Sequence, residues 1–105
     1  MPRGQKCRMI SGLPEYEMFS PRGRCGKDLI IMSVDEYEVI KLIDYLDLTQ
    51  EEASIKMNVA RTTVQQIYAN ARKKLALMLI SGRPIKISGG NYKLCNRSCY
   101  NKKDI

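Results

Sequence analysis

The sequence contains no histidine, no glycine-rich phosphate-binding loop and no uncharged apolar run of about 18 residues, the length that spans a bilayer. Its first residues also lack the apolar segment of a secretory signal, so we expect a cytoplasmic protein without a membrane partner. Paired carboxylates stand only where helix caps are expected, and the cysteines have no visible base. These absences argue against an enzyme, and no small-molecule substrate is indicated.

Four cysteines occur in 105 residues, a length that fits one domain. In a reducing compartment thiols are more often free or metal-bound than paired, so we assign no disulfide. Cys95 and Cys99 form a C-x3-C pair, which Cys7 and Cys25 could complete as a four-thiolate zinc or iron–sulfur site. Because the usual pair is C-x2-C, reduced thiols without metal are the alternative, and no other cofactor is predicted.

Charge is distributed unevenly along a chain whose formal net charge is +7. Residues 1–27 carry six basic and two acidic groups, residues 28–52 one and eight, and residues 53–105 eleven and one. This pattern suits a molecule with one basic face toward a polyanion and an acidic helix on the far side. A solvated basic surface without a partner is the alternative.

A first helix is predicted from Ser33, because its hydroxyl can cap the helix and Glu36, three residues on, completes a capping box. The same signal recurs at Thr49 and Glu52 and predicts a short second helix. Asn58 should end that helix, because asparagine tolerates a left-handed conformation. In the first helix an apolar stripe of Val39, Leu42, Ile43 and Leu46 lies opposite Asp35, Glu36, Lys41 and Asp44.

A third, longer helix is predicted to about Ser81, where Gly82 and Pro84 end it. Its apolar stripe consists of Ala60, Val64, Ile67, Ala71, Leu75 and Met78. The segment LALMLI near its end is apolar on every side and must therefore be covered, either by the two termini or by a second copy. We predict a homodimer on this ground.

The helices occupy residues 33–82, between a basic N-terminal arm with short strands (1–32) and a C-terminal region with a cysteine-containing tail (83–105). In the C-terminal region apolar residues alternate on both sides of Gly89 and Gly90, which predicts a β-hairpin.

Basic residues at both ends suggest two accessory contacts. The predicted hairpin places Lys86 opposite Lys93, which suits a wing laid along phosphates; the alternative is a hairpin that only covers the core. Arg3, Lys6 and Arg8 could form an arm that enters a minor groove, and the alternative is a disordered terminus.

The segment from about Thr49 to Lys73 has the pattern of a helix-turn-helix, so we predict a mainly α fold that binds double-stranded DNA. Small Ala53 and Ser54 stand where two helices cross closely, and Asn58 stands in the turn. Opposite its stripe, the third helix is polar, and arginine and glutamine can recognise guanine and adenine in the major groove. We assign Arg61, Thr62, Gln65 and Gln66 to bases and Arg72, Lys73 and Lys74 to phosphates. An ordinary hydrophilic helix surface is the alternative.

Five segments carry a resemblance that covers nearly the whole chain: MPRGQKCR, VDEYEVIKLID, LTQEEAS, MNVARTTVQQIYANARKKLA and GGNYKLC. The chain resembles the small uncharacterised bacterial and archaeal proteins predicted to bind DNA through a helix-turn-helix like that of sigma-factor region 4. The resemblance implies DNA binding and transcriptional regulation. It places Ala60, Arg61, Thr62, Thr63, Gln65 and Gln66 in the recognition positions. Family members often have glycine at position 58 and serine at position 60, so this chain lacks a hydroxyl cap at Ala60.

Two further functions stay open from the sequence. The acidic first helix could bind a basic protein, which would make the chain an interaction module, and the cysteines could make it a thiol- or metal-dependent regulator with the helix-turn-helix as adaptor. Salt dependence separates these functions from DNA binding, because each phosphate contact releases about 0.9 counterions.

Overall fold

The computed structural model describes residues 8–23 and 28–94. Three α-helices and two small sheets form this part of the chain, and about half of its residues are helical. The fold is therefore a mixture of helix and sheet and not the mainly α domain that the sequence predicts. Among these residues no helix has both the length and the hydropathy of a membrane span.

The helices begin at the predicted caps, and the second and third end at the predicted residues. Helix α1 (Val34–Ile40) starts with the capping box of Ser33 and Glu36, continues into a π-helical turn, η1 (Lys41–Tyr45), and α2 (Gln50–Met57) starts with the box of Thr49 and Glu52. Helix α3 (Arg61–Ser81) ends at Gly82, whose φ of 72° is left-handed. These caps satisfy backbone groups that every helix end leaves unpaired.

The strands form two sheets, and the predicted C-terminal hairpin is wrong. Strand β1 (Arg8–Ile10) pairs in parallel with β5 (Tyr92–Leu94). In the other sheet β4 (Ile85–Ile87) lies between β2 (Met18–Phe19), antiparallel to it, and β3 (Ile30–Met32), parallel to it.

The hairpin fails because both edges of β4 are already paired. After β4 the chain passes the start of α1, where the Val34 N–H donates to the Gly89 carbonyl at 2.9 Å. Consequently β5 joins a different sheet from β4. Lys86 lies opposite Met18 and Ile31 and Lys93 opposite Met9, so the two lysines do not face each other.

The described part of the predicted N-terminal arm is an integral part of the fold. It supplies three of the five strands, and Ile10 is completely buried. The reason is that Ile85 and Ile87 of β4 are themselves buried, and their strand needs partners on both sides that the helices cannot provide.

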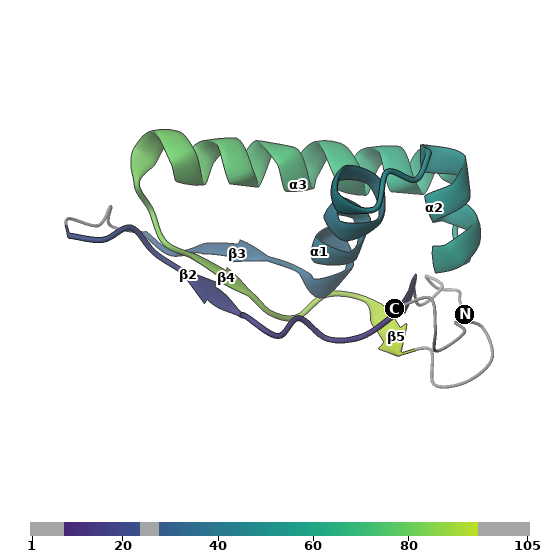
Figure 1. Cartoon of the computed structure of the whole chain (residues 1–105), viewed down its shortest axis with the longest axis horizontal. Coiled ribbons are helices and arrows are strands. Elements are labelled where there is room, and N and C mark those ends of the chain that lie inside the picture. Colours follow the sequence, from purple (N-terminus) through teal and green to yellow (C-terminus); the bar gives the residue numbers. More distant parts are fainter. Residues whose placement is uncertain (1–7, 24–27, 95–105) are drawn as a thin grey trace.

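Helix α3 links two hydrophobic clusters. Its first half packs on α1, η1 and α2, and its second half lies over the three-stranded sheet (Figure 1). The first cluster comprises Val39, Leu42, Ala53, Met57, Val64 and Ile67, and the second Ile10, Ile30, Met32, Val34, Ala71, Ile85 and Ile87. The predicted stripe of α3 is thus confirmed from Val64 to Met78, and Ala60, which precedes the helix, is exposed.

Of the predicted polar face of the first helix, Asp35 and Glu36 are buried, Lys41 is half-buried and Asp44 is exposed, and Glu38 of α1 is buried as well. Asp35, Glu36 and Glu38 are 6%, 7% and 0% exposed. Their carboxylates are partnered by the Arg8 guanidinium at 3.6 Å, the Lys74 ammonium at 2.7 Å and the Ser11 N–H at 3.2 Å, in that order. Three acidic residues expected on the outside of the molecule therefore lie inside it, because β1 and α3 cover this side of α1, whereas Asp44 on η1 stays exposed.

Candidate nucleic-acid interface

A tight turn joins α2 to α3. Asn58 adopts the left-handed conformation, with φ 59° and ψ 47°, as the sequence predicts. The Val59 N–H donates to the Ser54 carbonyl at 3.1 Å and closes the turn. Ala53 and Ser54 are buried, and the Ser54 hydroxyl donates to the Glu51 carbonyl at 2.7 Å, which satisfies that hydroxyl inside the helix crossing. Three residues therefore suffice to reverse the chain between two packed helices.

Helix α3 is fixed against α2 by its first apolar residues. Val64 is 0% and Ile67 6% exposed, in the same cluster as Ala53 and Met57 of α2. Ala60 is the N-cap residue of α3, and its side chain makes no capping hydrogen bond. The helix is thus held from behind by packing, and the roll about its axis is set by these buried side chains.

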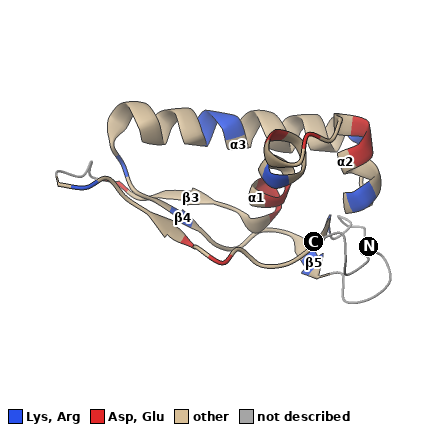
Figure 2. Cartoon of the chain, viewed as in Figure 1, with Lys and Arg blue, Asp and Glu red and all other residues tan. Residues whose placement is uncertain are grey.

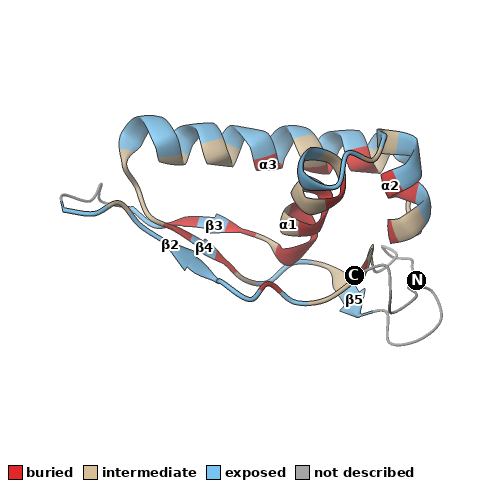
Figure 3. Ribbon diagram, in the orientation of Figure 1, coloured by how far each residue is buried: buried red, intermediate tan, exposed pale blue. Residues whose placement is uncertain are grey.

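The opposite side of α3 faces solvent. Arg61, Thr62, Gln65 and Gln66 are all exposed, and we refer to these four residues as the outer face. Their spacing of one, three and one residues keeps them on one side of a helix. Figure 3 shows that the side of α3 turned away from the sheet is exposed along its length. Thr63 lies at the edge of this face and is half-buried.

A polar cluster beside the outer face was not foreseen from the sequence. The Tyr68 hydroxyl donates to Asp44 Oδ1 at 2.7 Å, and Arg72 Nη1 donates to the same hydroxyl at 3.0 Å. The Arg72 guanidinium also lies 5.3 Å from the centre of the Tyr68 ring and 3.9 Å from Asp44 Oδ2. The i, i+4 spacing of Tyr68 and Arg72 indicates that these two side chains can meet on the helix surface, but it does not identify Asp44 on η1 as their partner.

The hydrogen bond to Asp44 is the main cause that raises the pKa of Tyr68 above its ordinary value of 10.0, and Arg72 acts in the opposite direction. Tyr68 therefore stays a neutral donor at physiological pH. It holds Asp44 and Arg72 together at the edge of α3, where Arg72 remains 61% exposed.

The two adjacent lysines of α3 differ. Lys73 is exposed, and no ion pair involves it in the described ranges. The Lys74 ammonium donates to Glu36 Oε1 at 2.7 Å and to the Ile31 carbonyl at 2.8 Å, so it ties α3 to α1 and β3. Lys73 is free to meet a phosphate, whereas the predicted phosphate contact of Lys74 does not fit its position.

Of the accessory contacts predicted at the termini, the described residues Arg8 and Lys86 are not brought to the outer face. Ile85 and Ile87 of β4 point into the core below α3, so the exposed Lys86 between them points away from α3. Arg8 belongs to β1 and pairs with Asp35. Arg3 and Lys6 lie outside the described residues.

The four predicted metal ligands, Cys7, Cys25, Cys95 and Cys99, also lie outside the described residues. Within residues 8–23 and 28–94 no group of three cysteine, aspartate or glutamate side chains is placed to hold a metal ion. The metal hypothesis therefore stays a prediction about the two ends of the chain.

Charge near the outer face is mixed. Figure 2 shows basic residues near the middle of α3 and acidic residues at the start of α2. Glu51 and Glu52 form the acidic first turn of α2, and Arg61 begins α3. An anion approaching α3 therefore meets positive charge at two places along the helix, at Arg61 and at Arg72 with Lys73.

Residues 1–95 match the model of a protein family described as "Protein of unknown function DUF134". A UPF0251 protein of Desulfitobacterium hafniense is 47% identical over 112 residues, which cover 98% of this chain and 90% of the relative. A UPF0251 protein of Ruminiclostridium cellulolyticum is 42% identical over 94% of this chain and 78% of its own length. One of Clostridium botulinum is 40% identical over 100% of this chain and 69% of the relative. No solved structure matches the chain.

Proposed function

The chain belongs to the DUF134 family, and because this family's description assigns no activity, we propose from the geometry of α3 that the protein binds double-stranded DNA and regulates transcription. In this proposal α2, the Asn58 turn and α3 form a helix-turn-helix of the sigma region-4 type. The observation that carries the proposal is the outer face. Four exposed polar side chains follow a tight turn directly, on a helix whose back is locked in the core.

The outer face has the chemistry of base recognition. A major groove about 12 Å wide admits one α-helix, and the residues near the helix N-terminus meet the base edges. Arg61 can donate two hydrogen bonds to guanine, and Gln65 and Gln66 can each pair with adenine. Thr62 is a short donor and acceptor that suits either a base or a phosphate.

Phosphate contacts come from residues one to two turns further along α3. Lys73 has no competing carboxylate among the described residues and can meet the backbone directly. Arg72 must give up its 3.9 Å contact with Asp44, which costs little because the pair is exposed. Each chain therefore supplies about two phosphate contacts, from Arg72 and Lys73, and Arg61 adds a positively charged contact to a base.

The alternative role as an interaction module for basic proteins has less support. It rests on an acidic first helix, but Asp35, Glu36 and Glu38 are buried and partnered within the fold. The alternative of a metal-dependent regulator concerns cysteines outside the described residues. Zinc and iron analysis of protein purified without oxygen tests it separately.

Salt-dependent DNA binding tests the proposal. Fluorescence anisotropy of a labelled duplex, measured over a series of salt concentrations, should give a slope of log K against log salt of about −2 per chain, since Arg72 and Lys73 each neutralise one phosphate and each phosphate contributes about −0.9. Lys73→Ala should reduce the slope by about 0.9. Lys86→Ala removes the same charge from the far side of the sheet and is the matched control, for which no change is expected. Binding that is insensitive to salt, or equal losses for both variants, contradicts the proposal.

A further inference from the structure

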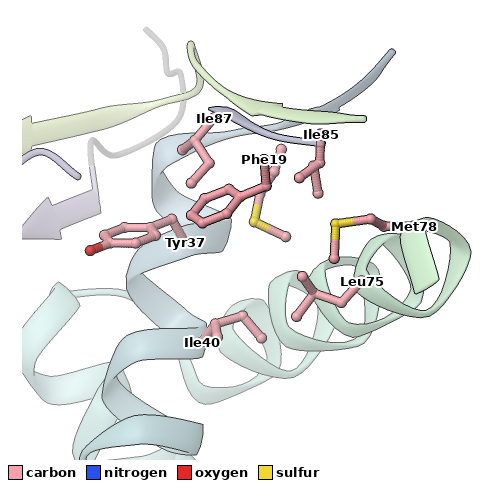
Figure 4. A pocket seen from close by; sticks show the side chains of 8 residues that line it. Phe19, Tyr37, Ile40, Leu75, Met78, Ile85 and Ile87 are labelled. Carbon is pink, nitrogen blue, oxygen red and sulfur yellow. The ribbon is translucent and has the colours of Figure 1, made fainter. Parts of the chain in front are cut away.

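An apolar groove opens between the three-stranded sheet and the second half of α3. Its volume is about 250 Å³. Figure 4 shows side chains from the sheet, α1 and α3 converging on it. The lining consists of Phe19, Met32, Tyr37, Ile40, Leu75, Met78, Ile85 and Ile87. The groove is a gap in the packing of the second core cluster, between the sheet and the helices that cover it.

The groove continues toward the C-terminal end of α3. Phe19 and Met78 line both this groove and a neighbouring hollow of about 280 Å³, which Leu79 borders. Beyond the hollow, Leu79 is 76% and Ile80 87% exposed. We refer to the exposed apolar side chains that surround this end of α3, together with Phe19 and Met78, as the apolar end surface. It comprises Phe19, Leu77, Met78, Leu79 and Ile80.

We propose that a second copy of this chain docks on the apolar end surface, about a two-fold axis near Leu79 and Ile80. The surface contains both a hollow and projecting branched side chains, and a two-fold contact needs both on the same surface. From Leu75 to Gly82 the helix carries no charge. Two copies with a formal net charge of +7 each can therefore meet there without bringing lysines and arginines of α3 against one another.

The exposed area indicates a weak rather than a permanent dimer. A fully exposed large apolar side chain offers roughly 60–120 Å², so the exposed parts of Phe19, Leu77, Leu79 and Ile80 offer roughly 150–300 Å² per copy. A stable interface needs about 800 Å² per partner. The apolar end surface supplies less than half of that area, so we expect the two copies to associate weakly, at high micromolar concentrations.

The position of the apolar end surface also suits a dimer that binds DNA, and this step of the inference rests on the proposed function. About 15 residues, or roughly 22 Å of helix, separate the outer face from Leu79. Two α3 helices that meet at their C-terminal ends can hold their N-terminal ends up to roughly 44 Å apart, which is enough to span the 34 Å of one turn of DNA. A contact at the other end of α3 would instead cover the outer face.

Sedimentation velocity without DNA tests the dimer independently of DNA binding. Wild-type protein should shift from about 12 kDa toward twice that mass as the concentration rises through the micromolar range. The double substitution Leu79→Asp with Ile80→Asp should keep the protein monomeric throughout. Both side chains are mostly exposed, so the variant should fold, which circular dichroism verifies. Tyr45→Asp is the matched control, because Tyr45 is 79% exposed on η1, and it should associate like the wild type.

Three results would overturn the dimer: a wild type that stays monomeric at every concentration, a double variant that associates as well as the wild type, or open-ended assemblies in place of a dimer. The proposed function has a separate readout. Binding to a duplex with a single half-site should be the same for the wild type and the double variant. If that binding is absent in both while the dimer forms, the proposed function fails and the dimer stands.

Discussion

Asp44 should restrain DNA binding, because it adds a negative charge beside the outer face, close to a phosphate that Arg72 would contact. Asp44→Asn keeps an oxygen that can accept from the Tyr68 hydroxyl and removes only the charge. The Asp44–Arg72 pair is 3.9 Å long and its side chains are 37% and 61% exposed, so its loss should change the free energy of unfolding by less than about 1 kcal/mol.

The effect on DNA affinity should be larger than the effect on stability. A phosphate that contacts Arg72 would lie within roughly 8 Å of the Asp44 carboxylate, where the repulsion between unit charges is on the order of 1 kcal/mol at a dielectric constant between those of the surface and water. Removing that charge should therefore tighten binding about fivefold, because 1.36 kcal/mol corresponds to a factor of ten. Anisotropy titrations at low salt measure the change, and it should shrink as salt rises.

Asp47→Asn is the control for Asp44→Asn. It removes the same charge a few residues away, and asparagine tolerates the left-handed φ of 63° that Asp47 adopts. We expect less than about a twofold change in affinity at this position. Equal gains for both variants would mean that only net charge matters, and weaker binding by Asp44→Asn would refute the role assigned to Arg72.

Three further predictions concern stability and are measured by urea unfolding. Gly90→Ala should lower the free energy of unfolding by about 2 kcal/mol or more, because at a φ of +106° the added Cβ would lie 2.5 Å from a carboxylate oxygen of α1. The control Gly89→Ala places its Cβ in open space and should cost about 1 kcal/mol, so equal costs for the two variants would contradict the clash. Lys74→Met should cost about 2 kcal/mol by leaving a mostly buried carboxylate of α1 without its cation, yet leave the DNA affinity of the folded protein unchanged. A parallel loss of affinity would show that Lys74 contacts DNA after all. Asn58→Ala should destabilise the protein by about 1 kcal/mol and Asn58→Gly should not, because only alanine is strained in the left-handed conformation. Similar free energies of unfolding for the two variants would show that the turn does not need a residue that tolerates this conformation.

Local signals in the sequence were sufficient for the helices. Ser33 and Thr49 cap their helices through side chains only three residues away, and Asn58 and Gly82 end theirs through their own backbone conformation. None of these interactions depends on distant parts of the chain. The same is true of the outer face, which follows from the position of Val64 on the buried side of α3.

Long-range pairing explains what the sequence did not predict. Whether β4 pairs with β5 or with β2 and β3 depends on partners more than 50 residues away, such as Ile30 opposite Ile85. A two-residue glycine turn is compatible with a hairpin, but it is equally compatible with an extended crossing between sheets.

The burial of charged residues was missed for a related reason. Periodicity places Asp35 and Glu36 opposite an apolar stripe, where polar residues normally meet water. Their partners, Arg8 and Lys74, come from other elements, and no local pattern identifies them. The same holds for Asp44, whose contact with Tyr68 joins η1 to α3 and alters the expected role of Arg72.

Selection of bound fragments from a pool of random duplex DNA tests most directly whether the outer face recognises bases. Wild-type protein should enrich a defined motif, and the double substitution Arg61→Ala with Gln65→Ala should lose preference at particular positions of that motif, each base contact being worth about 1–3 kcal/mol. Enrichment of no motif by the wild type, or of the same motif at every position by both proteins, would contradict the account.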